Sequence, residues 1–374
     1  MKKLNFYLFV LSCIFLCSCQ QDEMLTTNLQ GRNDISVGNI VTLKSGIKVR
    51  KNGDKYIFGR DMILSPKQLK ALDETGSIAG NITGELERNV SLNPVTNLPK
   101  NYDDLVQTRN MGIYPTPYNL WAMVRFVYDS NLTSTQRGYI KQALLELQSK
   151  TNLRFYNATG QPTRDPVYGI DYPYINFKSI GKSDVSYSYV GRIGGKQDVS
   201  LANFAFDNAS LGNYGVIIHE ICHAVGMLHE QSRPDRDNYV TINWNNLTDS
   251  GKEQFEKQGS NYFYRGDYDY ASVMGYGSFT TSISVVNDIF KPMYTKKDGS
   301  YLYQGNTVSD LDRMWINYLY LPYVARSDVY SELDTVVYDG NNRQLTEQER
   351  LQLQAQLNNG NPNPPAGGRI PNEF

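Results

Sequence analysis

Runs of apolar and β-branched residues predict several short strands along the chain. The clearest run is 121–128, which is apolar except for one arginine, and 55–58, 153–156 and 175–177 show the same character. A glycine-rich segment at 190–195 predicts a turn between two further strands. Most of these signals lie after residue 120, where the pattern becomes that of a packed domain.

Helical spacing of apolar positions, together with capping residues, predicts the helices. Ser65, followed by a proline, is typical of a helix start. Residues 215–225 form an apolar helix, and shorter helices are expected at 310–318 and 346–357. A further helix is predicted to open near Thr133. Its apolar stripe is formed by Ile140, Ala143, Leu144 and Leu147.

The N-terminus has the composition of an export signal. Two lysines precede an apolar run at 4–16, which is too short to span a bilayer comfortably. The run ends in Leu-Cys-Ser-Cys, similar to the lipidation motif of bacterial lipoproteins. The small residue before Cys19 favours this cysteine as the lipidated one, whereas bulky Leu16 makes Cys17 a poorer candidate. The alternative is an ordinary secretory signal whose cysteines are incidental.

These patterns divide the chain into four parts. A signal peptide at 1–18 precedes a polar tether and a small mixed region at 19–111. The main domain covers 112–320, and a polar tail, expected to be partly disordered, covers 321–374. The region at 19–111 is too small and too polar to be an independent enzyme.

Charge and cysteine content narrow the possible functions. Lys and Arg number 37 and Asp and Glu number 38, so the chain lacks the basic excess typical of nucleic-acid binders, and no nucleic-acid partner is expected. Of the four cysteines, two lie in the signal peptide and Cys19 follows it directly. If Cys19 carries lipid, Cys222 is a lone thiol and the mature protein has no intramolecular disulfide.

All three histidines of the chain fall in one short motif. His219 and His223 lie four residues apart, so a helix brings them onto the same face, with Glu220 beside them. Gly226 can end that helix with a positive φ, and the resulting turn can return His229 as a third ligand. A single histidine is more often a core or surface residue, but three at this spacing predict a zinc site.

Three protein ligands leave one coordination position open, which is typical of a catalytic rather than a structural zinc. One zinc ion per chain is expected. It lowers the pKa of a bound water to roughly 7 and polarises the scissile carbonyl. Glu220 can accept the proton of that water and pass it to the leaving amine, so the motif predicts hydrolysis by attack of the zinc-bound water.

The sequence around this motif resembles the astacin family of metzincin zinc endopeptidases. The segment 219–237 continues after the third histidine as Glu-Gln-Ser-Arg-Pro-Asp-Arg-Asp, an extension that separates astacins from other metzincins. The segments 189–195, 272–276 and 309–320 resemble the family's segment before the active-site helix, its Met-turn and its closing helix. The resemblance covers 112–320.

The resemblance implies an α+β fold: a metzincin-like, two-lobed catalytic domain with a twisted mixed sheet and an active-site helix. Met274 would form an apolar floor under the zinc. Tyr276 would be a switchable fifth ligand that binds the developing oxyanion. Glu230 would bind the N-terminal ammonium group of the processed enzyme, and an edge strand at 197–201 would pair with extended substrate.

Family members often carry an inhibitory propeptide with a Phe-x-Gly-Asp motif, whose aspartate binds the zinc. Here 58–61 reads Phe-Gly-Arg-Asp, with the glycine one place early. The resemblance implies that the region up to 111 is a propeptide and that Asp61 is its zinc ligand in the zymogen. The alternative is a turn aspartate after a strand. An activating protease would cut near 109–112, for example at the bond after Arg109.

The chain also departs from the family pattern. Catalytic domains of the family commonly contain two disulfides, but Asn152 and Ser186 stand at two of the expected cysteine positions. Cys222 lies inside the motif and is expected to be a packed core thiol rather than a ligand. Many relatives prefer an acidic residue after the scissile bond. Lys296 is the best candidate for a matching basic residue, and a solvated surface lysine is an equal alternative.

The sequence therefore predicts an exported zinc endopeptidase that is made as a zymogen and acts on proteins or peptides. The lipid anchor would place it at the outer membrane or cell surface of a Gram-negative-type bacterium, or it would be secreted after processing. One alternative is an adhesin or binding lipoprotein that keeps the metal without cleaving. Another is a zinc amidase acting on cell-wall peptides.

Overall fold

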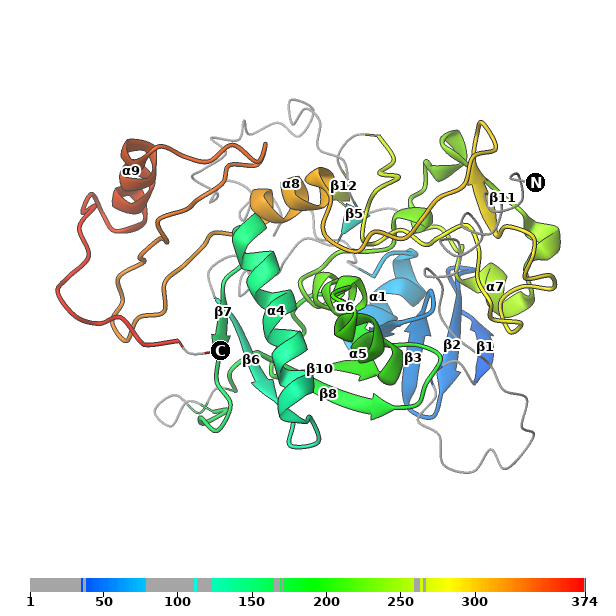
Figure 1. Cartoon of the computed structure of the whole chain (residues 1–374), viewed down its shortest axis with the longest axis horizontal. Helices are drawn as coiled ribbons and strands as arrows, with labels where there is room; N and C mark the ends of the chain where they lie inside the picture. Colours follow the sequence, from blue (N-terminus) through cyan, green and yellow to red (C-terminus); the bar gives the residue numbers. More distant parts are fainter. Residues whose placement is uncertain are drawn as a thin grey trace, which may run out of the picture.

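The structure is a computed structural model that describes residues 35, 38–78, 111–112, 123–164, 169, 171–258, 263–264, 267–372 and 374. Its main feature is one mixed sheet covered by helices (Figure 1). The α+β class is confirmed.

The sheet has nine strands in the order β1-β2-β3-β4-β9-β10-β8-β6-β7. Its first four strands belong to the N-terminal region and its last five to the main domain. The N-terminal strands are β1 (Asn39–Thr42), β2 (Lys48–Asn52), β3 (Lys55–Phe58) and β4 (Met62–Leu64). The others are β6 (Val124–Tyr128), β7 (Phe155–Asn157), β8 (Tyr174–Gly181), β9 (Tyr187–Tyr189) and β10 (Lys196–Ala202).

The N-terminal strands extend the sheet of the main domain across the pair β4 and β9. These two strands run parallel, with Met62 opposite Ser188 and Ile63 opposite Tyr189. Strand β10 pairs with β9 on one side and with β8 on the other. The expectation that 197–201 is an edge strand was therefore wrong. The edge of the main domain is β9, and β4 occupies it.

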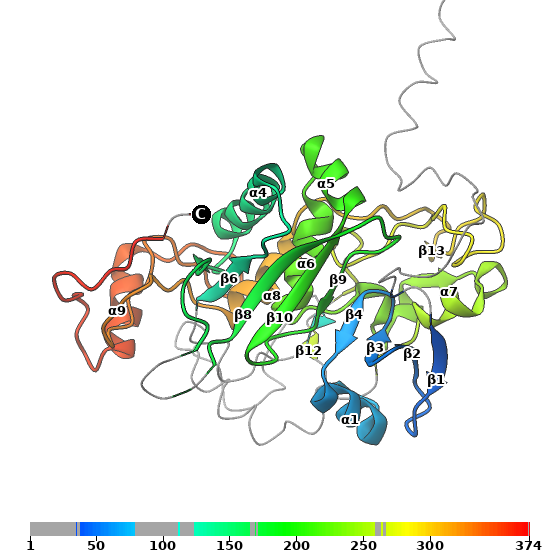
Figure 2. The same ribbon diagram turned by 90° about the horizontal axis from the view of Figure 1, so that it is seen from below.

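Three helices lie together on one face of the sheet: α4 (Ser134–Lys150), α5 (Asn203–Ser210) and α6 (Gly215–Ala224) (Figures 1 and 2). The predicted helix start at Thr133 is confirmed, since its side chain accepts a hydrogen bond from the backbone of Gln136. The apolar stripe of α4 is fully buried in a core shared with β6, β8 and α6. This packing fixes α6, which carries the zinc motif.

Shorter elements build the region after the motif. Strands β11 (Val240–Ile242) and β13 (Tyr294–Lys296) form one antiparallel pair, and β5 (Met111–Gly112) and β12 (Phe263–Tyr264) form another. The N-terminal region also contains helix α1 (Pro66–Thr75). The region after the motif contains helices α7 (Asp249–Glu253) and α8 (Asp310–Leu319). It also contains short 3-10 turns at Glu230–Ser232, Arg236–Asn238 and Trp244–Asn246. Among the described residues, no helix is long and apolar enough to cross a membrane.

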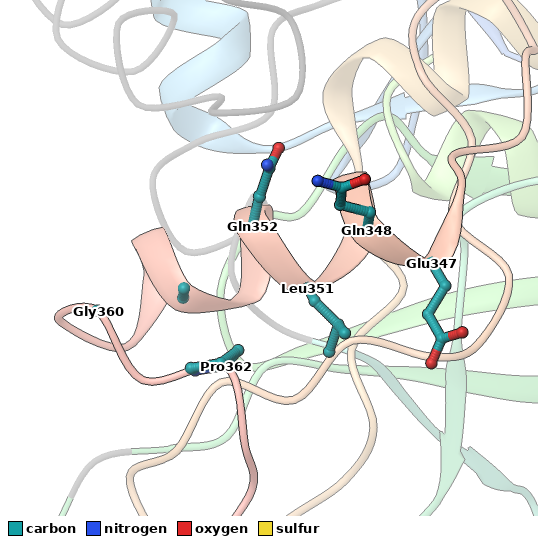
Figure 3. A pocket seen from close by; sticks show the side chains of 7 residues that line it. Glu347, Gln348, Leu351, Gln352, Gly360 and Pro362 are labelled. Atoms are coloured by element: carbon teal, nitrogen blue, oxygen red, sulfur yellow. The ribbon is translucent and has the colours of Figure 1, made fainter.

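The C-terminal segment 321–374 folds against the main domain, whereas the sequence had suggested partial disorder. It contains α9 (Glu347–Leu357) and a small core built around Leu333, Val337 and Leu353. These apolar side chains are too few and too scattered to show a periodic pattern. The sequence of 321–374 therefore predicted a polar, partly disordered tail. A shallow depression of about 490 Å³ runs along α9 (Figure 3).

Asn152, where the resemblance implied a cysteine, joins this segment to the main domain. Its backbone N–H donates to Asn317 Oδ1 of α8 at 2.7 Å, and its Nδ2 donates to the carbonyl of Tyr338 at 2.7 Å. The backbone N–H of Tyr338 returns a bond to Asn152 Oδ1 at 2.8 Å. A buried, satisfied polar side chain therefore links three segments that no disulfide joins.

Candidate metal centre

Helix α6 and the turn after it bring the three histidines together. The helix is buried along nearly its whole length, including His219, Glu220 and His223. Gly226 follows with φ of 117°, a conformation that side chains rarely adopt, so the predicted glycine turn is confirmed. The turn carries His229 back toward the helix.

The three imidazole groups converge on one point. His229 Nε2 lies 3.2 Å from His223 Nε2 and 3.3 Å from His219 Nε2. Two nitrogen ligands at the usual zinc distance and the tetrahedral angle lie about 3.3 Å apart. The spacing and the donor type therefore fit one zinc ion held by three imidazole nitrogens.

Asp61 supplies a fourth donor to this group. Its carboxylate oxygens lie 3.2 Å from His229 Nε2 and 3.6 Å from the Nε2 atoms of the other two histidines. One ligand atom from each of the four residues lies within 4.8 Å of all the others, and all four residues are buried. The predicted zinc is thus matched by a buried donor set of three histidines and one aspartate.

The turn between β3 and β4 brings Asp61 to the histidines. Gly59 has φ of 66°, and a β-carbon there would lie 3.3 Å from His229 Nδ1 and 3.0 Å from the Met62 methyl group. A glycine at 59 therefore lets the backbone approach the ring of His229 closely. The Phe-Gly-Arg-Asp sequence thus brings Asp61 to the histidines with its glycine at position 59.

The surroundings of Asp61 favour its charged form. Burial alone would raise the pKa of its carboxyl group, but the charge of His229 and hydrogen bonds from the three imidazoles outweigh it. The net pKa lies well below the ordinary value, so Asp61 is present as a carboxylate, the form that ligates a metal.

Backbone carbonyls orient two of the imidazole rings. His219 Nδ1 donates to the Val273 carbonyl at 2.8 Å, and His223 Nδ1 donates to the Met227 carbonyl at 2.8 Å. Asp312 in turn accepts hydrogen bonds from the backbone of Val273 at 2.9 Å and from Ser272 Oγ at 2.7 Å. Such outer contacts fix the tautomer in which Nε2 faces the metal. Sequence reasoning missed them because main-chain carbonyls leave no signal in a motif.

Glu220 lies buried beside the histidine group. Its Oε2 atom has no hydrogen-bond partner among the described residues. Burial and the negative charge of Asp61 raise the pKa of Glu220 to about 8. A buried carboxyl group with one free oxygen at this place is suited to accept and return a proton.

Tyr276 packs against the metal group from another segment. Its ring centroid lies 4.7 Å from that of His229, and its hydroxyl is buried with no partner among the described residues. Met274, two residues earlier, is buried in the main core. The structure therefore brings Tyr276 beside the histidines, as the resemblance implied.

Two other predicted residues occupy separate surroundings. Glu230 is buried, and its Oε1 accepts hydrogen bonds from Arg233 at 3.0 Å and from the backbone of Asp269 at 2.8 Å. Lys296 on β13 extends its ammonium group over the ring of Tyr270, 4.7 Å from the centroid. A specificity role for Lys296 stays a prediction.

The cysteine predictions divide between the described and the undescribed parts of the chain. Cys222 is fully buried in the core of α6, as expected for a packed thiol. Its burial raises the pKa of the thiol well above the ordinary value. Cys19 and Arg109 lie outside the described residues.

An α+β domain with a buried three-histidine centre on a helix and a glycine turn defines a mononuclear zinc protein. The family model of the astacin peptidases matches residues 114–321, more than half of the chain. The protein therefore belongs to the astacin family, and the resemblance noted from its motifs is confirmed.

Several relatives share this domain. The chain is 38% identical over 208 residues to zinc metalloproteinase nas-4 of Caenorhabditis elegans, covering 54% of this chain and 59% of the relative. It is 30% identical over 277 residues to zinc metalloproteinase nas-8 of the same organism, covering 72% and 59%. The match thus spans less than two thirds of these relatives' own length.

Among solved structures, high choriolytic enzyme 1, a hatching enzyme zinc-protease from Oryzias latipes, is 26% identical. The match has a TM-score of 0.43 and covers 55% of this chain and 92% of that one.

Proposed function

We propose that this protein is a zinc-dependent endopeptidase that hydrolyses protein or peptide substrates. The observation that carries the proposal is the convergence of three imidazole Nε2 atoms beside the buried carboxyl group of Glu220, whose Oε2 atom has no partner among the described residues. A purely structural zinc would be closed by four permanent protein ligands. Here the fourth donor, Asp61, comes from the N-terminal region that the family pattern marks as removable.

The residues of the chain have distinct parts in this proposal. Zinc, when bound, supplies a Lewis acid for the scissile carbonyl and an acidified water. Glu220 holds a proton on its carboxyl group and delivers it to the leaving amine. Tyr276 directs its hydroxyl toward the oxygen of the scissile carbonyl as negative charge develops there.

We also propose that the intact chain is a zymogen. Two contacts support this: Asp61 takes the fourth donor position, and β4 covers the edge of β9, where an extended substrate could otherwise pair. Removal of the region up to 111 would free both places at once. Glu230 Oε2 is buried without a partner among the described residues, which suits it to receive the new N-terminal ammonium group.

Metal removal gives a direct test of the enzyme proposal. After limited trypsin treatment to release the N-terminal region, the protein should cleave casein. Phenanthroline should lower the rate by at least about 100-fold, because the metal contributes several kcal/mol of transition-state stabilisation. Added zinc should restore it. Zinc binding without any cleavage would instead support the non-cleaving adhesin or binding lipoprotein.

We propose, finally, that Cys19 carries a lipid that holds the protein at a bacterial membrane surface, on the basis of the export signal and the Leu-Cys-Ser-Cys sequence. In a Gram-negative host, wild-type protein should sediment with membranes, and Cys19→Ser should move most of it to the soluble fraction. Equal sedimentation of both proteins would refute the lipid anchor.

A further inference from the structure

The N-terminal region holds the main domain through one buried arginine far from the metal ligands in sequence. Arg50 of β2 places its Nη2 atom 2.8 Å from Glu253 Oε2 and 2.7 Å from Ser250 Oγ, both on α7. Arg50 is 8% exposed and Glu253 only 1% exposed. Arg50 and Glu253 lie 203 positions apart in the sequence, so this contact depends on the N-terminal region being in place.

The main domain forms a socket around this guanidinium group. Its walls include Gln254, Ser284 and Val285, and only about 10 Å³ of open space remains beside the arginine. The backbone of α7 lies so close to that of Val285 that a β-carbon on Gly251 would fall 2.1 Å from the Val285 carbonyl oxygen. The socket is thus built from tightly packed backbone.

The socket can accept more hydrogen bonds than Arg50 donates to it. Glu253 Oε1 is buried with no partner among the described residues, so the carboxylate could accept a second hydrogen bond from a guanidinium group. Glu256 lies nearby, and the charge of Lys48, two residues before Arg50 on β2, acts on it. Arg50 thus contacts Glu253 directly, whereas Lys48 acts on Glu256 through its charge, as Arg236 of the main domain also does.

One wall residue of the socket is next in sequence to a member of the metal group. Arg60, which also lines it, is the residue immediately before Asp61. If the N-terminal region leaves, Glu253 loses its cation. A guanidinium group is the strongest hydrogen-bonding partner of a carboxylate, so the vacated socket is suited to a new cationic ligand.

We infer that Glu253 and Ser250 form a recognition site for an arginine side chain, filled by Arg50 in the intact chain and by an arginine of the protein substrate after processing. The second half of this inference rests on the proposed peptidase function. The first half does not.

The first experiment uses the intact chain with Glu220→Gln as background, so that no self-cleavage occurs. Arg50→Gln, Glu253→Gln and the double variant are compared by hydrogen exchange of the β2 amides. Each single variant should speed exchange about tenfold, and the double variant should be no faster than either single one. Additive effects, or no effect, would overturn the site whether or not the protein is an enzyme.

The second experiment uses the processed protein and matched peptide pairs with arginine or glutamine scanned along the sequence. Wild type should prefer arginine about tenfold in kcat/KM at one position, and Glu253→Gln should bring the ratio of arginine to glutamine cleavage close to one. Glu347→Gln on exposed α9 is the matched control and should keep the preference. A preference that survives in Glu253→Gln would overturn the substrate site.

Cleavage of no peptide by wild type would instead count against the proposed function. In that case the exchange experiment still decides whether Glu253 and Ser250 recognise arginine.

Discussion

Glu220→Gln is expected to lower the casein-cleaving rate of the processed protein by at least about 100-fold while leaving one zinc ion bound per chain. The amide has nearly the same shape, but it cannot accept a proton and return it to the leaving amine. General acid–base groups typically contribute about 100- to 10,000-fold to a rate. Once the N-terminal region and Asp61 are gone, the remaining donors of the group are three histidine rings, which this substitution does not change.

The measurement pairs kcat/KM with zinc content by atomic absorption. Glu347→Gln, the same chemical change on exposed α9, should match wild type in both. Wild-type activity in Glu220→Gln would mean that another group moves the proton. Loss of zinc together with activity would mean that Glu220 supports the metal site rather than the proton transfer.

Local patterns predicted the elements that carry the centre. The start of α4 was visible because Thr133 and Gln136 form a capping box, and α6 because its apolar run contains both helical histidines. The turn at Gly226 was likewise visible, since it needs a conformation that glycine adopts most readily. These features depend on neighbours within a few residues, which a sequence displays directly.

Contacts between distant segments were not visible in the same way. The sequence suggested β10 as an edge strand, but β9 pairs with it and separates it from β4. The three residues 62–64 show no pattern from which their pairing with β9 could be predicted. The hydrogen bonds of Asn152 with α8 and Tyr338 join residues up to 186 positions apart. The socket for Arg50 has the same origin, because Arg50 and Glu253 come from segments that are distant in the sequence.

Among the contacts of the N-terminal region with the main domain, three bear on inhibition: Asp61 at the histidines, β4 along β9, and Arg50 in its socket. Each contact alone would be weak against a large substrate. Because they lie on one continuous sheet, loosening one leaves the other two in place. The peptidase activity of the intact chain should therefore rise stepwise as these contacts are removed one after another.

Asp61→Ala is expected to raise the peptidase activity of the unprocessed protein about tenfold or more. Removing one member of a buried charged group typically costs about 3–5 kcal/mol, and about 1.4 kcal/mol already changes a population tenfold. The substitution takes away the only carboxylate that contacts the three Nε2 atoms among the described residues. The activity should stay below that of processed protein, because β4 still covers β9.

The measurement is hydrolysis of a short fluorogenic peptide by uncut protein, with gel analysis to show that the N-terminal region remains attached. Asp54→Ala, an exposed aspartate in the turn between β2 and β3, is the control and should remain as inactive as wild type. Combining Asp61→Ala with Arg50→Gln should raise activity further, since the two contacts hold the same region at different points. Unchanged activity in uncut Asp61→Ala would show that strand pairing alone, not the carboxylate, keeps the intact chain inactive.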